Sequence, residues 1–429
     1  MNSKFIQSIV CTLMALSFSG VVNAQLWTLQ SSIAQAMSTS PELKISSTKI
    51  GARTSELQLS DMWPDPSLEL KVDNQIGRDE GTGDYGLSEI TISQDIPLSR
   101  IKHQKSVAEA QLNAAMHSQS NDTLALQNRV ANVFYELQFA SASYELTQRR
   151  VKLADKLNAS ANGKKHDAMV RYLTPLEKMR LGIISEKAHQ EEAAAEGKYR
   201  ETLTEFYKLL GIDSNSSVNV PELLPVMDIP KLEFLSDLQD KHPLLSTQQQ
   251  ILHAATNEID LARNSAMKDP SISINRLREN FTSGTENVYG VMLNIEIPIH
   301  DRKSSKVSKA NYNASQQRIE LARLKRELQI NLNQSYTHLK HVMEQTSEYK
   351  IKVLNPATKI LNLSEKGFIS GELNILSLVD ANNTYFESYM QYLDLIYQSW
   401  VEIADINLYA GQFITIDNTQ ANINYTGVK

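Results

Sequence analysis

The stretch SLELKVDNQI spans residues 67–76, and its apolar and polar side chains alternate along the chain. Leu68 and Leu70 occupy one set of positions, while Glu69 and Lys71 occupy the other. Successive side chains of a strand point to opposite faces of the sheet. The alternation therefore predicts a β-strand with one apolar face and one charged face.

Three further segments show this pattern, and together they predict two strand pairs. The clearest is YGVMLNIEIPI at residues 289–299, and weaker alternation runs through residues 87–96 and 271–277. Glycine-containing polar segments at 77–86 and 282–287 predict the connecting turns. The polar positions that we expect to face a channel lumen are Glu69, Lys71, Asp73, Asn294 and Glu296.

Strand length separates two interpretations of this pattern. A soluble antiparallel sheet packs its apolar face on a core, and its strands average about 5 to 6 residues. Transmembrane strands need about 9 to 11 residues, which is close to the length of these segments. Four strands cannot close a barrel, since single-chain barrels begin at about eight, and an open sheet in lipid would leave unpaired edges. Spanning strands therefore require several copies of the chain. Two copies would leave an interior filled by side chains, whereas three would give a wider lumen.

The strand pairs belong to a repeat in which the second half of the chain resembles the first about 200 residues later. Four short motifs recur in the same order: SPEL at 40–43 and KHPL at 241–244, DPSL at 65–68 and DPSI at 269–272, DIPL at 95–98 and EIPI at 296–299, LG at 210–211 and AG at 410–411. Solenoid repeats have periods of only about 20 to 50 residues. The long period instead predicts a duplicated half, with repeats at 25–211 and 242–412.

A very long helix is predicted to follow each strand pair. Residues 98–162 contain neither glycine nor proline, and a helix of that length measures roughly 90 Å. Residues 302–366 have the same character, with a kink or local break expected at Pro356. A conventional coiled coil is the alternative interpretation of these two segments.

Each long helix is predicted to end in a turn that leads into a return helix. One return helix is expected over 174–211, where Thr174, Pro175 and Glu177 form a capping box with proline at the first helical position. The other is expected over 374–412, with Asn374 at the N-cap. Two helical hairpins should therefore point their tips away from the strands.

The remaining segments predict export and a break between the halves. Residues 1–24 have the layout of a cleaved secretory signal, and they contain Cys11, which is the only cysteine. A mature chain without thiols excludes disulfides, cysteine-bound zinc and a cysteine nucleophile. Prolines scattered through 212–241 predict a linker, and residues 413–429 are expected to form a poorly ordered tail. The net charge of −6 is spread without basic blocks, so no nucleic-acid partner is expected.

With these features in order, the sequence resembles the outer-membrane efflux factor family, the TolC-like exit ducts of Gram-negative tripartite pumps. The resemblance is carried by the repeated motifs above and most of all by KGF at 366–368, GELNIL at 371–376 and LVDA at 378–381. It covers nearly all of residues 28–415, and within the family it looks closest to the heavy-metal or cation branch that serves resistance-nodulation-division pumps.

This resemblance implies a mainly helical chain with a transmembrane β-barrel, in which a homotrimer forms a 12-stranded barrel and a 12-helix periplasmic tunnel. It implies an outer-membrane location with a periplasmic extension, contact with outer-membrane lipid, a periplasmic adaptor and an inner-membrane pump. Such a duct has no reaction to catalyse and no cofactor, and it passes metal ions or small toxic compounds. A duct for type I protein secretion and a structural coiled-coil protein of the envelope are the alternatives.

The resemblance also implies where the channel closes and where a partner binds. The expected gate residues near the second tip are Glu372 and Asp380, because rings of like charge at a constriction tune ion passage. The expected adaptor contacts are Arg171, Tyr172, Leu173, Gly371 and Leu373. Arg171 stands where the second tip has Gly371, so the two tips should contact the adaptor unequally.

Two further kinds of site are considered by residue type, a metal site and a catalytic site. His338 and His341 are three residues apart on a predicted helix and could share a metal ion, although such pairs on a polar helix are more often solvated. No nucleophile elbow or paired catalytic motif is present in the sequence. The sequence thus predicts no enzyme.

Overall fold

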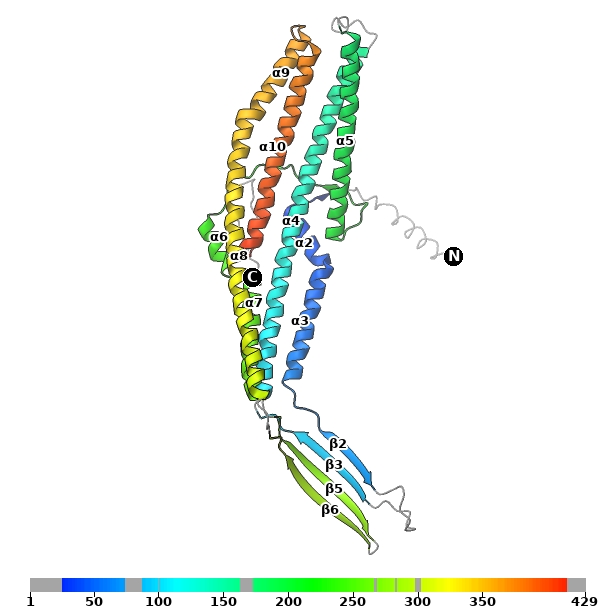
Figure 1. Cartoon of the computed structure of the whole chain (residues 1–429). Helices are drawn as coiled ribbons and strands as arrows, with labels where there is room; N and C mark the ends of the chain where they lie inside the picture. Colours follow the sequence, from blue (N-terminus) through cyan, green and yellow to red (C-terminus); the bar gives the residue numbers. More distant parts are fainter. Residues whose placement is uncertain are drawn as a thin grey trace, which may run out of the picture.

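The computed structural model describes residues 25–73, 87–98, 100–162, 173–265, 268–281, 284–297 and 302–414. The described chain forms a long rod of helices with one small sheet at one end and two helical tips at the other (Figure 1). The predicted signal at 1–24, the first strand turn at 77–86 and nearly all of the predicted tail lie outside the described residues.

Four helices run along most of the rod. The long helices are α4 (Arg100–Asn162) and α8 (Arg302–Tyr349), and the return helices are α5 (Pro175–Leu210) and α10 (Ile375–Ala410). With 63 residues, α4 measures about 95 Å. The predicted capping box is confirmed: Thr174 accepts from the Glu177 N–H, and the Glu177 carboxylate accepts from the Thr174 N–H. Asn374 likewise caps α10 by accepting from the Ser377 N–H at 2.9 Å.

The expected break at Pro356 is replaced by a change of helix type. A π-helical segment (Lys350–Leu354) follows α8 directly, and α9 (Asn355–Ile369) continues the rod to the tip. Proline has no N–H to donate and its ring crowds the carbonyl four residues earlier. The wider turn accommodates the proline, since the Asn355 N–H donates to the Lys350 carbonyl five residues back. The helix therefore bulges there without breaking.

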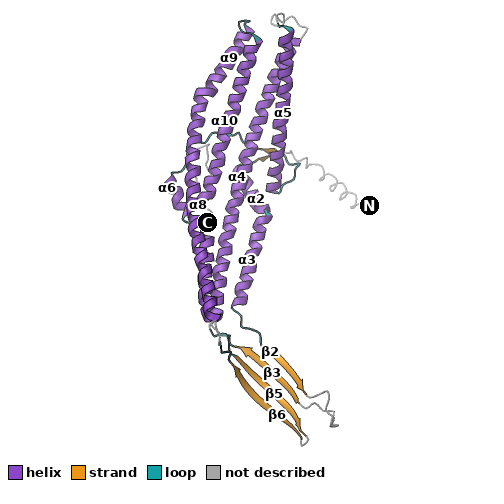
Figure 2. Ribbon diagram, in the orientation of Figure 1, coloured by secondary structure: helices purple, strands orange, loops and turns teal. Residues whose placement is uncertain are grey.

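The sheet contains β2 (Ser67–Asp73), β3 (Leu87–Asp95), β5 (Ser271–Phe281) and β6 (Gly284–Asn294). Its order is β2-β3-β5-β6, and every neighbouring pair is antiparallel (Figure 2). The turn predicted at 282–287 is wrong in extent, because Arg278 pairs with Asn287 and the ladder continues to Phe281 and Gly284. Polar residues there are exposed on both faces of the ladder, so their polarity did not require a loop.

The sequence pattern failed to predict four shorter helices: α2 (Leu29–Thr39), α3 (Pro41–Ser60), α6 (Leu232–Gln239) and α7 (Pro243–Asn264). A two-residue parallel pair, β1 (Gln25–Leu26) with β4 (Val218–Asn219), was also missed. The segment 212–241 therefore contains β4 and α6 besides extended linker. Each half of the chain opens with two short helices separated at a proline, and α3 and α7 lead to the sheet (Figure 1).

The repeated motifs of each half meet in space and form the same joint twice. In the first half the Thr39 hydroxyl donates to the Leu210 carbonyl at 2.9 Å, beside Gly211 at the end of α5. In the second half His242 bonds the Leu408 carbonyl at 2.9 Å, beside Gly411 at the end of α10. The junction of two short helices thus docks on the end of the return helix in both halves.

The largest apolar core lies at the middle of the rod, where the linker crosses the helices. The Trp400 indole donates to the Leu224 carbonyl at 2.7 Å and stacks on Tyr135 with 4.8 Å between ring centroids. The Gln138 amide donates to the Pro221 carbonyl at 2.8 Å. These bonds hold the linker against α4 and α10.

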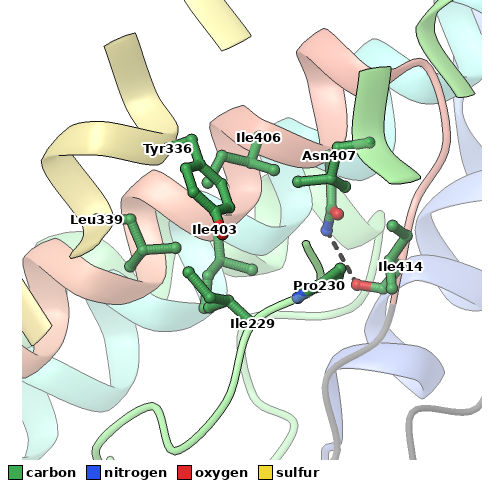
Figure 3. A pocket seen from close by; sticks show the side chains of 9 residues that line it. Ile229, Pro230, Tyr336, Leu339, Ile403, Ile406, Asn407 and Ile414 are labelled. Atoms are coloured by element: carbon green, nitrogen blue, oxygen red, sulfur yellow. Dashed lines mark hydrogen bonds between the residues drawn. The ribbon is translucent and has the colours of Figure 1, made fainter. Parts of the chain in front are cut away.

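A small apolar pocket remains in this core, shown in Figure 3. Ile229 and Pro230 of the linker form one side, and side chains of α8 and α10 form the other. The Asn407 amide donates to the Ile414 carbonyl at 3.0 Å and so ties the end of the described chain to α10. The pocket has no charged lining residue, and we assign it a packing role only.

Candidate functional site

One face of the sheet is apolar and exposed. In register, Leu68 faces Ile92, Ile92 faces Ile274 and Ile274 faces Val291, so one apolar row crosses all four strands. These side chains are exposed in the single chain, up to 78 % for Val291. The other exposed apolar side chains of this face are Leu70, Val72, Ile90, Ile272, Tyr289 and Leu293. No helix of the described ranges covers the face (Figure 1), and an extended exposed apolar patch marks an interaction surface.

The opposite face of the sheet is mostly polar and hydrogen-bonded, although Val288 and Met292 of β6 are exposed apolar side chains on it. It carries Glu69, Lys71 and Asn294, three of the predicted lumen residues, because residues that alternate with the apolar row share this face. The Asn275 amide donates to the Glu89 carboxylate at 2.7 Å, across β5 and β3. The Ser93 and Ser273 hydroxyls, also on these strands, are 2.7 Å apart. The sheet thus has one apolar face suited to contact with lipid and one mostly polar face suited to contact with water.

The other two predicted lumen residues lie at the margins of the sheet. Asp73 ends β2, where it pairs with Leu87. Glu296 lies beyond the end of β6, in the connection to α8, and forms an ion pair with Lys268 in the connection to β5. Glu296 therefore belongs to the junction between sheet and helices.

The second helical tip is closed by a Schellman motif. The Glu372 N–H donates to the Gly367 carbonyl at 2.8 Å, and the Gly371 N–H donates to the Phe368 carbonyl at 3.1 Å, which are the two bonds of this motif. Gly371 has φ +81°, a conformation that side chains disfavour. At Gly367 a Cβ would lie 2.8 Å from Cδ1 of Leu373. Both glycines are thus required by the turn.

Predicted gate residues Glu372 and Asp380 are exposed, Glu372 in the turn and Asp380 on α10. The linker contacts α10 on the side of Tyr389, which lines a groove together with Pro221 and Glu222. Asp380 precedes Tyr389 by nine residues, which at 3.6 residues per turn is half a rotation. Asp380 therefore points away from the linker-covered face of the rod.

Predicted tip residues Arg171 and Tyr172 lie outside the described residues, whereas Leu173 is half-buried. Leu173 packs against a small apolar cluster near the tips, formed by Leu181 of α5 and by Ile375, Leu378 and Val379 of α10. The cluster joins the two hairpins near their ends. The predicted tip residues Gly371 and Leu373 are exposed on the second hairpin.

Arg150 links the two hairpins below this cluster, and sequence reasoning missed it. Its guanidinium forms an ion pair with Glu191 of α5 and donates to the Asn383 amide oxygen of α10 at 3.0 Å. It also lies 5.8 Å from the centroid of the Phe386 ring. The Arg150 side chain is only 18 % exposed. One side chain of α4 thus holds α5 and α10 together.

Comparison with known proteins shows which of them this chain resembles. No protein-family model matches the sequence. The chain is 26% identical over 291 residues to protein CyaE of Bordetella pertussis, covering 62% of this chain and 59% of CyaE. It is 22% identical over 275 residues to the cobalt-zinc-cadmium resistance protein CzcC of Cupriavidus metallidurans, covering 62% of this chain and 65% of CzcC. Each match thus spans less than two thirds of the relative.

Solved structures match over almost the whole chain. The transmembrane channel CusC has a TM-score of 0.73 at 16% identity, covering 90% of this chain and 92% of CusC. The CmeC outer membrane channel of Campylobacter jejuni has a TM-score of 0.72 at 14% identity, covering 89% of this chain and 85% of CmeC. The chain has the TolC-like fold. The predicted resemblance to outer-membrane efflux channels is confirmed, and the predicted outer-membrane location agrees with these relatives.

In this TolC-like chain the predicted histidine pair shows no metal-binding geometry. His338 Nδ1 lies 2.7 Å from a carboxylate oxygen of Glu402 on α10, and His341 is exposed on α8. Within the described ranges, no group of three or more His, Cys, Asp or Glu side chains could hold a metal ion. Nor is any helix in those ranges long and apolar enough to cross a membrane.

The two sides of the TolC-like rod carry exposed apolar stripes. On α8, Tyr312, Ile319 and Ile330 lie about half a turn from the buried stripe of that helix and are up to 79 % exposed. On α5, Leu176, Met179 and Ile183 form a stripe opposite the side chains that α5 buries. The two stripes lie on opposite edges of the rod and at different heights, that of α5 near the tips and that of α8 toward the sheet (Figure 1).

Proposed function

We propose that the chain is the outer-membrane exit duct of a tripartite efflux pump, a passive channel from an inner-membrane pump across periplasm and outer membrane. The observation that carries the proposal is the exposed apolar face of a four-stranded sheet at the end of a rod about 95 Å long. With 11 residues each, β5 and β6 are long enough to span a bilayer. The relatives with this fold are channels, and the proposed duct catalyses no reaction.

The single sheet cannot span a membrane alone, because the outer edges of β2 and β6 would be unpaired in lipid. In the proposed homotrimer, β6 of one chain pairs with β2 of the next, and three copies close a 12-stranded barrel. The exposed stripes support burial of both edges of the rod in an oligomer, where the stripe of α5 near the tips and that of α8 toward the sheet would contact different parts of the neighbouring chains. Unlike surfaces that meet head to tail close into a ring, here a 12-helix tunnel.

The polar sheet face then lines the barrel, with Glu69, Lys71 and Asn294 toward water. The face of α10 that points away from the linker lines the tunnel, and Asp380 is repeated three times around its axis. A ring of carboxylates favours cations over anions. With Glu372 at the turn, Asp380 forms the proposed gate at the helical tips. Arg171, Tyr172, Leu173, Gly371 and Leu373 are the proposed contacts for a periplasmic adaptor.

The proposed cargo is metal ions or small toxic compounds delivered by a resistance-nodulation-division pump. The relative CzcC is named for resistance to cobalt, zinc and cadmium, and an acidic gate suits divalent cations. The expected negative charge at Glu372 and Asp380 supports this choice over a protein cargo of type I secretion.

Conductance measurement tests the proposal. Detergent-extracted protein should be a trimer and should raise the conductance of planar bilayers. The E372Q/D380N variant should lose most of the cation preference, seen as a shift of the reversal potential toward zero under a salt gradient. E233Q is the matched control, because Glu233 is an exposed carboxylate of α6 in the linker segment, away from the proposed tunnel face of α10. A freely soluble dimer without conductance would contradict the duct and favour a structural coiled-coil protein of the envelope.

A further inference from the structure

Two arginines interrupt the apolar face of the sheet, Arg276 at the middle of β5 and Arg278 nearer the end farthest from the helices. Arg276 of β5 stands between Ile90 of β3 and Tyr289 of β6 in register. Arg278 follows two residues later toward the distal end, so its side chain shares this face. Both arginines are exposed. The apolar face therefore ends in a pair of cations.

The Arg276 side chain leans toward the distal end of the sheet. Its guanidinium donates to the Asn287 amide oxygen of β6 at 3.1 Å. Asn287 is the residue that pairs with Arg278, one row beyond Arg276. The hydrogen bond thus brings the Arg276 guanidinium toward Arg278, as expected for a long cationic side chain that reaches from apolar surface toward a polar layer.

Neither guanidinium has an acidic partner among the described residues, for which no ion pair of Arg276 or Arg278 is found. Glu89 and Glu286, the carboxylates of the adjacent strands, belong to the opposite face by their register. A partner chain would not supply the missing acid at this position. In the ring, a neighbouring chain pairs only with β2 and β6, and β5 is enclosed by β3 and β6 of its own chain.

These arginines lie at the distal margin of the apolar face, because its last described apolar side chains, Tyr289 and Val72, lie in the rows of Arg276 and Arg278. Arginine on the lipid face of a barrel costs about 2–4 kcal/mol at the bilayer midplane but only about 0–1 kcal/mol near the interface. Tyr289, 72 % exposed beside Arg276, is an aromatic of the kind that marks this interface. Two guanidinium groups that have no acidic partner among the described residues would face lipid headgroups if this margin lay at the membrane surface. Guanidinium binds phosphate through paired N–H donors.

We propose that Arg276 and Arg278 bind the phosphate groups of lipid headgroups in the outer leaflet of the membrane. The proposal rests on the proposed function, because it requires the sheet to span the membrane with its distal end outward. The pair then acts as an anchor that fixes the depth of the barrel and retains phosphorylated lipid on each subunit.

Native mass spectrometry of the intact protein in detergent tests this site. Purified trimer is titrated with diphosphoryl lipid A, with a neutral galactolipid of similar acyl content, and with diphosphoryl lipid A plus inorganic phosphate. Wild-type protein should bind the phosphorylated lipid preferentially. R276Q/R278Q should weaken that binding about tenfold or more while the oligomeric state and conductance remain. R318Q is the matched control, since Arg318 is an exposed arginine of α8, and it should bind lipid like the wild type.

Equal binding of the phosphorylated lipid by R276Q/R278Q and wild type would overturn the proposal, even when the trimer conducts normally. So would complete displacement by millimolar inorganic phosphate, which would identify free phosphate as the ligand. A wild-type protein that forms no conducting trimer would instead overturn the proposed function, and the lipid site with it. The conductance record therefore distinguishes the two failures.

Discussion

At the scale of single residues, two glycines and a histidine explain why the repeated motifs are where they are. Gly211 and Gly411 end α5 and α10 with φ values of +63° and +82°. Each lies against the junction of the two short helices of its own half, at Thr39, the last residue of α2, in one case and at His242, the N-cap of α7, in the other. The motif pairs noted in the sequence are therefore the two sides of one contact.

Replacing Gly411 by alanine should destabilise this joint. The new Cβ would lie 2.9 Å from the His242 Cα, and the left-handed backbone adds strain. We expect a loss of about 1–3 kcal/mol, measured as a lower Tm by circular dichroism. G197A is the control, because Gly197 lies within α5 with open space around its Cα, and alanine there should be neutral or stabilising. Equal Tm values for the two variants would refute the assignment.

His242 should make the joint sensitive to acid. His242 is only 2 % exposed. Its Nδ1 accepts from the Leu244 N–H, and its Nε2 bonds the Leu408 carbonyl. Burial lowers the pKa of His242 below the ordinary value of 6.5. The unfolded chain then takes up a proton at higher pH than the folded chain. The contribution of neutral His242 to the free energy of unfolding is therefore fully present above pH 6.5. It falls as the pH drops below that value, by at most about 1.4 kcal/mol per pH unit.

A pH series of thermal melts measures this effect against H242Q, which keeps a donor and an acceptor but does not titrate. The wild type should lose more Tm than H242Q between pH 7.5 and 5.5. Parallel curves for the two proteins would show that His242 does not carry the acid sensitivity.

At the scale of elements, Arg150 is a polar contact that connects the two hairpins of one chain, below the apolar cluster near the tips. R150M should lower the free energy needed to separate α5 from α10, because it removes the ion pair with Glu191 and the hydrogen bond to Asn383. We expect a higher conductance of the isolated duct and a Tm lower by a few degrees. R149M is the matched control, since Arg149 pairs with Glu145 on the same helix. Identical conductance of R150M and R149M would remove Arg150 from the gating contacts.

Prediction from sequence succeeded where one local rule decides the element. Alternation located the strands, and the capping box at Thr174 fixed the start of α5. It failed for α3 and α7, whose starts were noted only as repeated motifs although Pro41 and Pro243 occupy the first helical position, where proline is favoured. Contacts such as that of Arg150 depend on how three helices pack against one another. The spacing of residues along one helix does not predict that packing.

At the scale of the whole molecule, the stripes at the two edges of the rod should hold the trimer together. I319E/I330E places two carboxylates on the apolar stripe of α8, where each buried isoleucine would contribute about 1.5–3 kcal/mol. We expect monomers, or a trimer that dissociates at lower temperature, by light scattering after size exclusion. M227E is the control, because Met227 is 75 % exposed on the linker. A wild-type-like trimer in I319E/I330E would place the subunit contact elsewhere.

The two open edges of the sheet impose an order on biogenesis. Before the proposed trimer assembles, a single chain has unpaired backbone N–H and C=O groups along the outer edges of β2 and β6. It also has an exposed apolar sheet face, and the two together promote aggregation. The helical hairpins bury their core within one chain, so they can fold in transit. In the proposed trimer the sheet is completed only when neighbouring strands pair with its two edges, so before assembly it is the part of the chain most exposed to aggregation.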